Sequence, residues 1–310
     1  MGTPNDTVVT EFILIGLSEH PRAQVVFFWI FLVVYLISTL GNGLMIVLII
    51  SDSHLHSPMY FFLCVLSSVD FILSNNAIPE ILVNCFFYRP TVSSYRCLVQ
   101  MYVGLCVVGT ECLLLAIMAY DRFAAVCQPL HYMQIMSWRF CTSLVITSMS
   151  VSLLNTLLEV LLKPTDFCGQ NILNHFACEL QSFLRLACSD IHTTELYMKV
   201  ASFLFLIPPF GFIVLTYVRI GLAVLRIRST QGRKKAFSTC SSHIAVVSVF
   251  YGTIMIMYLK PQEKSASDQD KIISLIYGVL TPTLNPLIYS LRNRDVKEAF
   301  WRLFGRKKSE

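Results

Sequence analysis

Charged residues are scarce in this chain. Asp, Glu, Lys and Arg make up 14% of its 310 residues, whereas 55% are hydrophobic. A soluble domain has roughly a quarter of its residues charged, so the composition excludes a water-exposed surface over most of the chain. Long polar linkers, internal repeats and low-complexity runs are also missing, which indicates one domain over residues 1–310.

Uninterrupted apolar stretches take the place of the missing charge. A membrane-spanning helix needs about 20 mostly apolar residues, and seven segments meet that requirement. They are Val25–Ile50, Pro58–Asn84, Val99–Tyr120, Phe140–Leu162, Val200–Leu225, Ala236–Leu259 and Ile272–Leu291. The sequence therefore predicts an all-α membrane protein, a bundle of seven transmembrane helices over residues 25–291.

Lysine and arginine gather on one side of the predicted bundle. The segment between the fifth and sixth spans and the tail over residues 292–310 are rich in them, and such short segments stay in the cytosol. Residues 1–24 carry Asp6, Glu11 and Glu19 against Arg22. We therefore expect a multi-pass plasma-membrane protein with an extracellular N-tail and a cytoplasmic tail. The net positive charge then reflects topology and not nucleic-acid binding.

Two features agree with that orientation. Asn5-Asp6-Thr7 is a glycosylation acceptor in the predicted extracellular tail. Four cysteines fall in the predicted outer loops, on the oxidising side of a membrane, and allow three disulfide pairings: Cys97, Cys168, Cys178 and Cys188. The longest loop, from Lys163 to about Lys199, contains three of them, so we expect it to form a braced lid.

Apolar and basic residues alternate at helical spacing after the seventh span. The apolar residues are Val296, Phe300, Leu303 and Phe304, and the basic ones between them are Arg294, Lys297 and Arg302. This pattern predicts a short amphipathic helix that lies on membrane lipid at the inner face.

Four motifs, in order along the chain, resemble those of vertebrate olfactory receptors in the rhodopsin-like, G-protein-coupled class. They are Pro58-Met-Tyr-Phe-Phe-Leu63, Met118-Ala-Tyr-Asp121-Arg122-Phe-Ala-Ala-Val-Cys127-Gln-Pro-Leu-His-Tyr132, Lys235-Ala-Phe-Ser-Thr-Cys240-Ser-Ser-His243 and Pro286-Leu-Ile-Tyr289-Ser-Leu-Arg-Asn293. The resemblance implies a receptor, not an enzyme, that binds small, mostly hydrophobic odorants. It also implies a stimulatory, olfactory-type heterotrimeric G protein as partner, cyclic AMP as output, and the disulfides Cys97–Cys178 and Cys168–Cys188.

Asp121 and Arg122 stand where the third predicted helix meets the cytosol. An adjacent carboxylate holds a guanidinium that is otherwise costly at that depth. In receptors of this class the Arg is released on activation, and Tyr217 and Tyr289 resemble the tyrosines that stabilise its released position. We place His243 with this G-protein-coupling group. The alternative is that Arg122 only anchors the topology.

Asp70 and Glu111 are carboxylates inside predicted spans, where they are expensive and seldom face lipid. At about 1.5 Å per residue the two reach a similar level in the membrane, and Asn42 and Asn285 come from neighbouring depths. These four residues are expected to form a polar cluster that holds Na⁺, a shared proton or waters. The alternative is a structural hydrogen-bond network. No other cofactor and no transition-metal site is expected.

The predicted pocket is defined partly by what it lacks. No carboxylate occurs at Gly104 or Leu105, where amine receptors have one, and no Lys occurs in the seventh span to carry retinal, so both chemistries are disfavoured. The remaining candidates lie on single faces of the third, fifth and sixth helices: Met101, Leu105, Val108, Gly109, Ser202, Phe205, Tyr251, Ile254, Met255 and Tyr258. Ordinary interhelical packing is the alternative reading of each.

Three questions stay open at this level. The sixth span has no Pro, the commonest cause of a sharp kink. Either Gly252 is the hinge of this helix, or the helix bends only in the active state. His175 and Cys178 have metal-ligand spacing, but pairing with Cys97 would remove Cys178 as a ligand. The rival functions are an odorant-type receptor that senses a metabolite outside the nose, and a transporter or channel, which would need inverted repeats that the sequence does not show.

Overall fold

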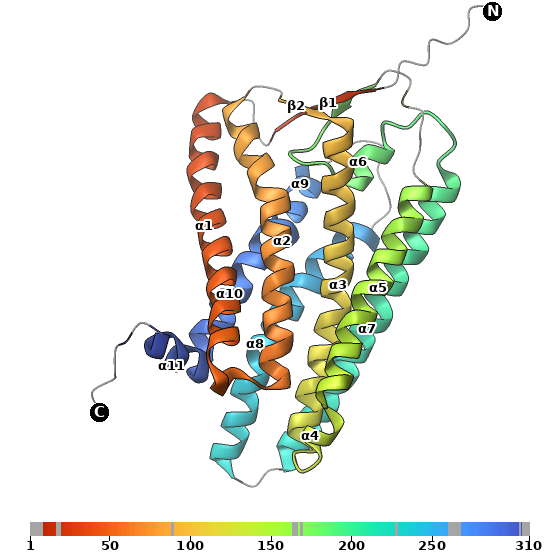
Figure 1. The fold of residues 1–310 in the computed structure, drawn as a ribbon. Helices are drawn as coiled ribbons and strands as arrows, with labels where there is room; N and C mark the ends of the chain where they lie inside the picture. Colours follow the sequence, from red (N-terminus) through yellow and green to blue (C-terminus); the bar gives the residue numbers. More distant parts are fainter. Residues whose placement is uncertain are drawn as a thin grey trace, which may run out of the picture.

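The computed structural model describes residues 9–16, 20–87, 90–162, 167, 170–226, 229–259, 268–303 and 305. Within this part of the chain, seven helical segments are long and apolar enough to cross a membrane (Figure 1). Six are single helices: α1 (Pro21–Ser51), α2 (Pro58–Phe86), α3 (Ser94–Cys127), α5 (Trp138–Leu161), α7 (His192–Arg226) and α8 (Thr230–Leu259). The seventh consists of α9 (Asp268–Leu275), the π-helical turn η2 (Ile276–Leu280) and α10 (Thr281–Arg292). The predicted seven-helix bundle is confirmed.

α7 begins at His192, well ahead of the predicted start at Val200. The His192 amide donates to Asp190 Oδ1 at 2.9 Å, and Lys199 lies 3.6 Å from the Glu195 carboxylate one turn away. The apolar window stopped where these charges begin, but a cap and an ion pair extend the helix past the lipid-crossing part.

The outer end of α3 and the inner end of α8 also reach beyond the predicted spans. Ser93 Oγ accepts a hydrogen bond from the Arg96 amide at 3.3 Å, so α3 starts at Ser94. α8 starts at Thr230, ahead of Ala236, and carries basic residues in its first turns. The hydropathy pattern locates the lipid-crossing core of each helix but not its ends.

Prolines shape the seventh span. Pro286 has no N–H, so the carbonyl of Pro282 one turn earlier loses its helical donor. Asn42 Nδ2 and Ser38 Oγ of α1 donate to that carbonyl instead, at 2.9 and 3.2 Å. α8 in contrast is continuous, and no break occurs at Gly252 in this conformation. The irregular backbone lies in the seventh span and not in the sixth.

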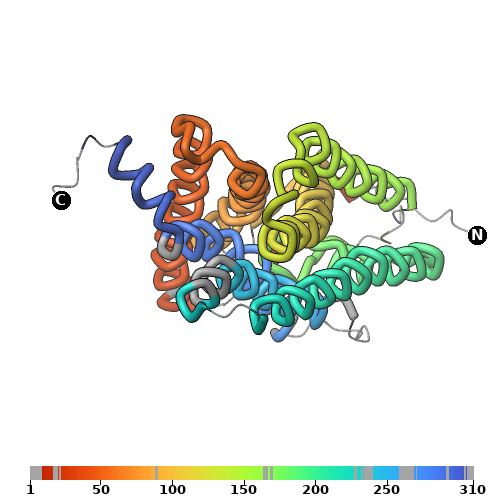
Figure 2. Tube along the Cα trace, turned by 90° about the horizontal axis from the view of Figure 1, so that it is seen from below, coloured from red at the N-terminus to blue at the C-terminus, as the bar shows by residue number. Residues whose placement is uncertain are grey.

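α3 is the central helix, since it packs against α2, α5, α7 and α8. The largest core cluster surrounds its inner half, where Leu114 and Leu115 are fully buried together with Phe250 and Tyr251 of α8. Figure 2 shows the bundle from below, with the chain's last helix projecting past α1.

A small sheet closes the outer end of the bundle (Figure 1). The strand β1 (Glu11–Leu14) pairs antiparallel with β2 (Thr91–Ser93) and parallel with β3 (Ile172–Leu173). Phe12 and Leu14 are buried beneath it, beside the short helix α6 (Leu180–Leu184). The N-tail and the long outer loop are therefore joined as one cover.

The opposite end carries three short helical elements: η1 (Ser53–Leu55), α4 (Tyr132–Ile135) and α11 (Arg294–Leu303). α11 confirms the predicted amphipathic helix, with Val296 and Ala299 buried and Trp301 and Leu303 exposed. Phe304 lies outside the described residues.

Candidate ligand-binding and signalling sites

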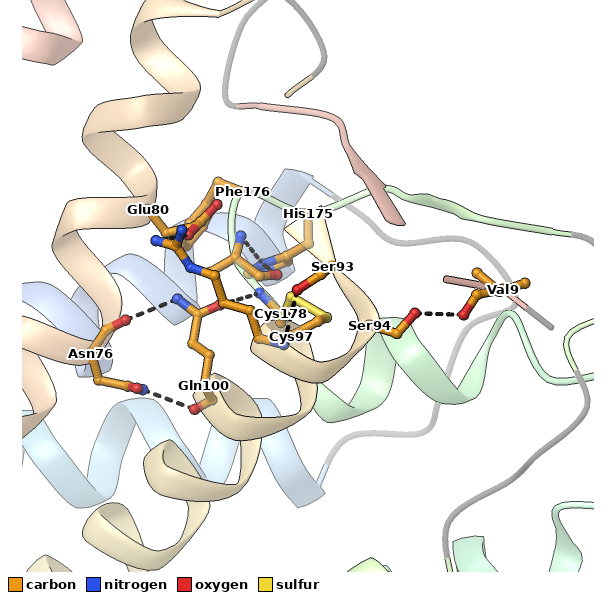
Figure 3. The surroundings of a disulfide bond; sticks show 12 residues. Val9, Asn76, Glu80, Ser93, Ser94, Cys97, Gln100, His175, Phe176 and Cys178 are labelled. Carbon is orange, nitrogen blue, oxygen red and sulfur yellow. Dashed lines mark hydrogen bonds and ion pairs between the residues drawn. A yellow bond between two sulfur atoms is a disulfide. The ribbon is translucent and has the colours of Figure 1, made fainter. Parts of the chain in front are cut away.

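The outer cover is fastened to the bundle at Cys178 (Figure 3). Cys97 and Cys178 form a disulfide with their Cα atoms 5.3 Å apart. The Cys178 amide also donates to Gln100 Oε1 at 3.1 Å, and Gln100 Nε2 donates to the Asn76 carbonyl at 2.9 Å. The predicted Cys97–Cys178 pair is thus confirmed, although Cys97 lies in the first turn of α3 and not in a loop.

The second predicted pair is not tested. Cys188 is disulfide-bonded, but Cys168 lies outside the described residues, and so does the glycosylation candidate Asn5. The Cys168–Cys188 pairing and the glycan stay predictions.

His175 connects the cover to the seventh span through Glu179. His175 Nε2 lies 3.0 Å from Glu179 Oε2, and Tyr277 donates to Glu179 Oε1 at 3.3 Å. The sulfur of Cys178 is committed to its disulfide, so His175 has no thiolate beside it for a metal.

A first cavity of about 90 Å³ lies directly under the cover. Met101, Leu105 and Val108 line it from α3, and the cover contributes residues from His175 to Leu180. The predicted face of α3 therefore borders this cavity, below the disulfide that we expected to brace the lid.

A second cavity, of about 70 Å³, lies deeper between α3, α5, α7 and α8. Six of the predicted pocket residues line it: Leu105, Val108, Gly109, Ser202, Phe205 and Ile254. Because Leu105 and Val108 border both spaces, the two cavities adjoin across the same face of α3.

The remaining pocket candidates lie elsewhere. Tyr251 is fully buried, and its hydroxyl donates to the Cys112 carbonyl at 2.7 Å, so it packs α8 against α3 and is not a free donor. Met255 is not among the residues that line either cavity. The side chain of Tyr258 lies outside the described part of the chain.

Polar residues of α5 complete the second cavity, and the sequence reasoning missed them. Ser152, Asn155 and Glu159 line it opposite Ser202. The rule that drew attention to Asp70 and Glu111, a carboxylate within a span, applies equally to Glu159. Glu159 stands two residues from the end of α5, inside the predicted span Phe140–Leu162.

Mid-membrane, Asp70, Glu111 and Asn285 meet as predicted. Asn285 Nδ2 donates to Asp70 Oδ2 at 2.9 Å and approaches Glu111 Oε1 at 3.5 Å. All three residues are buried, and within the described part of the chain Asp70 Oδ1 and Glu111 Oε2 have no hydrogen-bond partner. Two carboxyl groups thus share one amide donor and keep acceptor capacity, which suits a small cation or a shared proton.

Asn42 is not part of that contact. Its amide donates to the Ser38 carbonyl at 3.0 Å as well as to Pro282, and among the described residues no hydrogen bond joins it to Asp70 or Glu111. A similar depth in the membrane did not lead to contact. Pro286 leaves the Pro282 carbonyl without its helical donor, and the Asn42 amide donates to that carbonyl instead. Asn42 therefore fastens α1 to α10.

At the inner end, Arg122 donates to the carboxylate of Asp121. Both side chains are buried. Tyr132 of α4 donates to the other oxygen, Asp121 Oδ1, at 2.7 Å. Burial, reinforced by the charge of Asp121, raises the pKa of Tyr132 well above its usual range, so the hydroxyl remains a donor. Asp121 therefore ties Arg122 and the second inner loop together.

The other predicted switch residues lie nearby without bonding to Arg122. Tyr217 and His243 are joined by a hydrogen bond of 2.7 Å between the hydroxyl and Nδ1, which links α7 to α8, and their rings stack. Tyr289 is buried, and its hydroxyl has no partner. This is an arrangement in which Arg122 is held by Asp121 and neither tyrosine contacts it.

Comparisons with known proteins agree with this architecture. The family model described as olfactory receptor matches residues 31–307. Human olfactory receptor 13H1 is 50% identical over 299 residues, covering 96% of this chain and 97% of that protein. Mouse olfactory receptor 5AR1 is 44% identical over 308 residues, covering 99% of each. The crystal structure of squid rhodopsin matches 92% of this chain and 86% of its own with a TM-score of 0.71 at 18% identity, which concerns the fold alone.

The similarity extends over nearly the whole chain and includes all four motifs that suggested it. A seven-span, multi-pass membrane protein with such relatives is a G-protein-coupled signalling receptor and not an enzyme. The chain belongs to the olfactory receptor family.

Proposed function

We propose that this receptor binds small, mostly hydrophobic volatile molecules that enter from the extracellular side. The observation that carries the proposal is the pair of adjoining cavities beneath the disulfide-fastened cover. Their walls are mainly apolar, with few polar groups to fix orientation, as is usual for small-molecule sites.

Ligand affinity should be weak, because the contact area is small. An odorant of roughly ten heavy atoms that gains about 0.5 kcal/mol per atom binds with about 5 kcal/mol. This corresponds to a dissociation constant on the order of 100 μM. Selectivity then depends on shape and on a few polar contacts.

The signal leaves the receptor at its inner end. Ligand binding favours a state in which Asp121 releases Arg122, and the inner part of α8 moves outward. Arg122 and the basic region between α7 and α8 then contact a heterotrimeric G protein of the stimulatory olfactory type, which raises cyclic AMP. The Tyr217–His243 bond would have to rearrange in that motion, because it joins the two helices that separate.

The same proposal places the protein in the plasma membrane with its N-terminus outside. The disulfide and the β-sheet lie at one end of the bundle, and α11 lies at the other (Figure 1). Disulfides persist on the oxidising side, and amphipathic helices with basic residues favour the cytoplasmic face. Asn5 would then be accessible for glycosylation.

Na⁺ is proposed as an ion held by Asp70 and Glu111. The two buried carboxyl oxygens without a partner, Asp70 Oδ1 and Glu111 Oε2, are the hard oxygen ligands that such an ion takes. A bound cation would offset the cost of burying two carboxylates together. The ion would therefore favour the conformation described here.

The test is a cyclic AMP assay in cells that express the receptor with or without the stimulatory olfactory α subunit. A panel of volatiles should raise cyclic AMP only when that subunit is present, at concentrations near 100 μM, a value on the order estimated above. Responses that are independent of the subunit would contradict the proposed coupling. Surface labelling of intact cells at the N-terminus checks the orientation.

A further inference from the structure

Glu159 of α5 has a carboxyl oxygen without a partner at the wall of the second cavity. The residue is 8% exposed, and Oε2 makes no hydrogen bond with any residue that the structure describes. Among the described residues no ion pair joins Glu159 to a Lys, Arg or His. A buried carboxyl group that borders an empty space and lacks a partner is costly unless something else completes it.

The other oxygen of Glu159 is held in place by a short chain of bonds. Asn155 Nδ2 donates to Glu159 Oε1 at 2.9 Å, and Tyr197 of α7 donates to Asn155 Oδ1 at 2.8 Å. The Tyr197 bond fixes which end of the amide faces Glu159. The carboxyl group is therefore oriented by its neighbours while Oε2 stays unused.

Ser152 adds a second unused polar atom to the same cavity. It is 1% exposed, and its hydroxyl has no hydrogen-bond partner. The rest of the lining is mainly apolar, formed by Leu105, Val108, Phe205 and Ile254, with Ser202 of α7 beside them. The unbonded polar atoms of the cavity are thus on α5, and the neighbouring helices supply mostly apolar walls.

Other carboxylates in the spans are accounted for differently. Glu80 of α2 lies 3.1 Å from Arg96, which supplies a cation. Asp70 and Glu111 share Asn285 and are not among the residues that line the two cavities. Glu159 combines an unpartnered oxygen with a position on a cavity wall.

We propose that Glu159 anchors ligands that carry a hydrogen-bond donor at one end, a protonated amine most strongly and a hydroxyl less strongly. The donor would bond to Oε2, with Ser152 Oγ as an additional partner, while the alkyl part packs on the apolar wall. A protonated amine also supplies the missing cation, and charge-assisted hydrogen bonds are about twice as strong as neutral ones. An ether of the same size would leave Oε2 without a donor.

This inference rests on the proposed function as an odorant receptor and departs from one expectation from the sequence. Amines were disfavoured because Gly104 and Leu105 of α3 offer no carboxylate. Here the carboxylate comes from α5 and faces the same space from the other side, since Leu105 and Glu159 line one cavity.

The experiment compares three molecules of equal size on the purified, full-length receptor: hexylamine, hexanol and methyl pentyl ether. Binding is read from the ligand-dependent rise in melting temperature, which requires no G protein. We expect hexylamine to bind most tightly, hexanol next and the ether weakest. Absence of any preference for the two donors over the ether would overturn the proposal.

Variants then assign that preference to Glu159. Glu159→Gln should weaken hexylamine binding by about tenfold or more, because a charge-assisted bond is worth about 1.5 to 3 kcal/mol, and it should not weaken ether binding, since the amide N–H can donate to the ether oxygen. Glu159→Asp keeps the charge and should keep the preference for hexylamine. Glu80→Gln is the matched control, since it removes a buried carboxylate outside the cavity, and it should keep the ligand order.

The outcomes separate this proposal from the coupling proposed above. If Glu159→Gln binds all three molecules as the parent does, the anchor is wrong whatever cyclic AMP shows. If hexylamine binds through Glu159 but cyclic AMP does not rise, the anchor stands and the coupling fails. Should Glu159→Gln not fold, Glu159→Asp and Ser152→Ala decide: loss of the amine preference in Asp, or unchanged hexanol binding in Ala, counts against the site.

Discussion

The Arg122 cluster at the inner end and the second cavity differ in how their buried polar groups are bonded. At the inner end the principal groups are paired: Arg122 with Asp121, Asp121 with Tyr132, and Tyr217 with His243. At the second cavity, Glu159 and Ser152 have atoms with no hydrogen-bond partner among the described residues. The bonds of Tyr132 and Tyr217 join different elements and hold them in one arrangement, whereas the unbonded atoms at the cavity can take a partner from a ligand. The contrast fits a receptor whose outer half receives a ligand and whose inner half is a latch.

The largest effect expected comes from removing the centre of the latch. Arg122→Ala should abolish ligand-induced cyclic AMP while leaving surface expression largely intact, because the residue is proposed to contact the G protein. Arg139→Ala is the matched control, since Arg139 is an exposed arginine at the same inner face. Undiminished signalling at equal surface level would remove Arg122 from the coupling site and leave only an anchor.

The mid-membrane carboxylates, Asp70 and Glu111, lie between the ligand cavities and the Arg122 cluster and are part of neither. If Asp70 and Glu111 share Na⁺, the parent receptor should melt at a higher temperature in NaCl than in choline chloride. Asp70→Asn and Glu111→Gln should each remove that difference. A double-mutant cycle should show coupling of about 0.5 kcal/mol or more. Purely additive effects, or equal melting in both salts, would mean that the pair is a structural network.

Sequence reasoning predicted best where a rule depends on spacing along one helix. The seven spans, the α11 amphipathic pattern and the common depth of Asp70 and Glu111 all follow from helical geometry. The Cys97–Cys178 pair came from the family resemblance, since spacing alone left three pairings. Contacts between helices were harder to predict from the sequence. Asn42 lies at the expected depth, yet its amide bonds to the Pro282 carbonyl.

The missed features depend on what surrounds a residue in three dimensions. Tyr251 has the right helical face, but its hydroxyl meets the Cys112 carbonyl, which no periodicity reveals. The π-helical turn η2 and the early start of α7 arise from local bonding that hydropathy does not measure. Glu159 was visible in the sequence, but its importance comes from the cavity beside it.

The second cavity can be narrowed from its α3 side. A Cβ at Gly109 would lie 3.3 Å from both Phe205 Cε1 and Ser152 Oγ, so Gly109→Val should reduce the room for the alkyl part of a ligand. Larger odorants should lose potency several-fold relative to smaller ones in the cyclic AMP assay. Gly211→Val is the control, because Gly211 is exposed and nothing lies within 4 Å of a Cβ there. An unchanged ligand ranking in Gly109→Val would place the binding site elsewhere.

The smallest effect expected concerns the seam that holds α11 to the inner end, where Arg302 Nε donates to Asp52 Oδ2 at 2.8 Å. Burial acts to raise the pKa of Asp52, but the bonds from Arg302 and His54 outweigh it and lower that pKa below its usual value. A lowered pKa means that the pair stabilises the folded receptor above the unfolded pKa of about 3.9. This contribution fades as the pH falls through the folded pKa.

Because Arg302 is partly exposed, Arg302→Gln should cost only a few tenths of a kcal/mol near neutral pH, as for other surface pairs. Melting curves from about pH 6 to about pH 3 should therefore show parent and variant converging at the acidic end. Arg294→Gln, which removes an arginine paired only with Glu298 within α11, should not reproduce the convergence. A constant difference between parent and Arg302→Gln across that range would show that Asp52 is not what holds α11 in place.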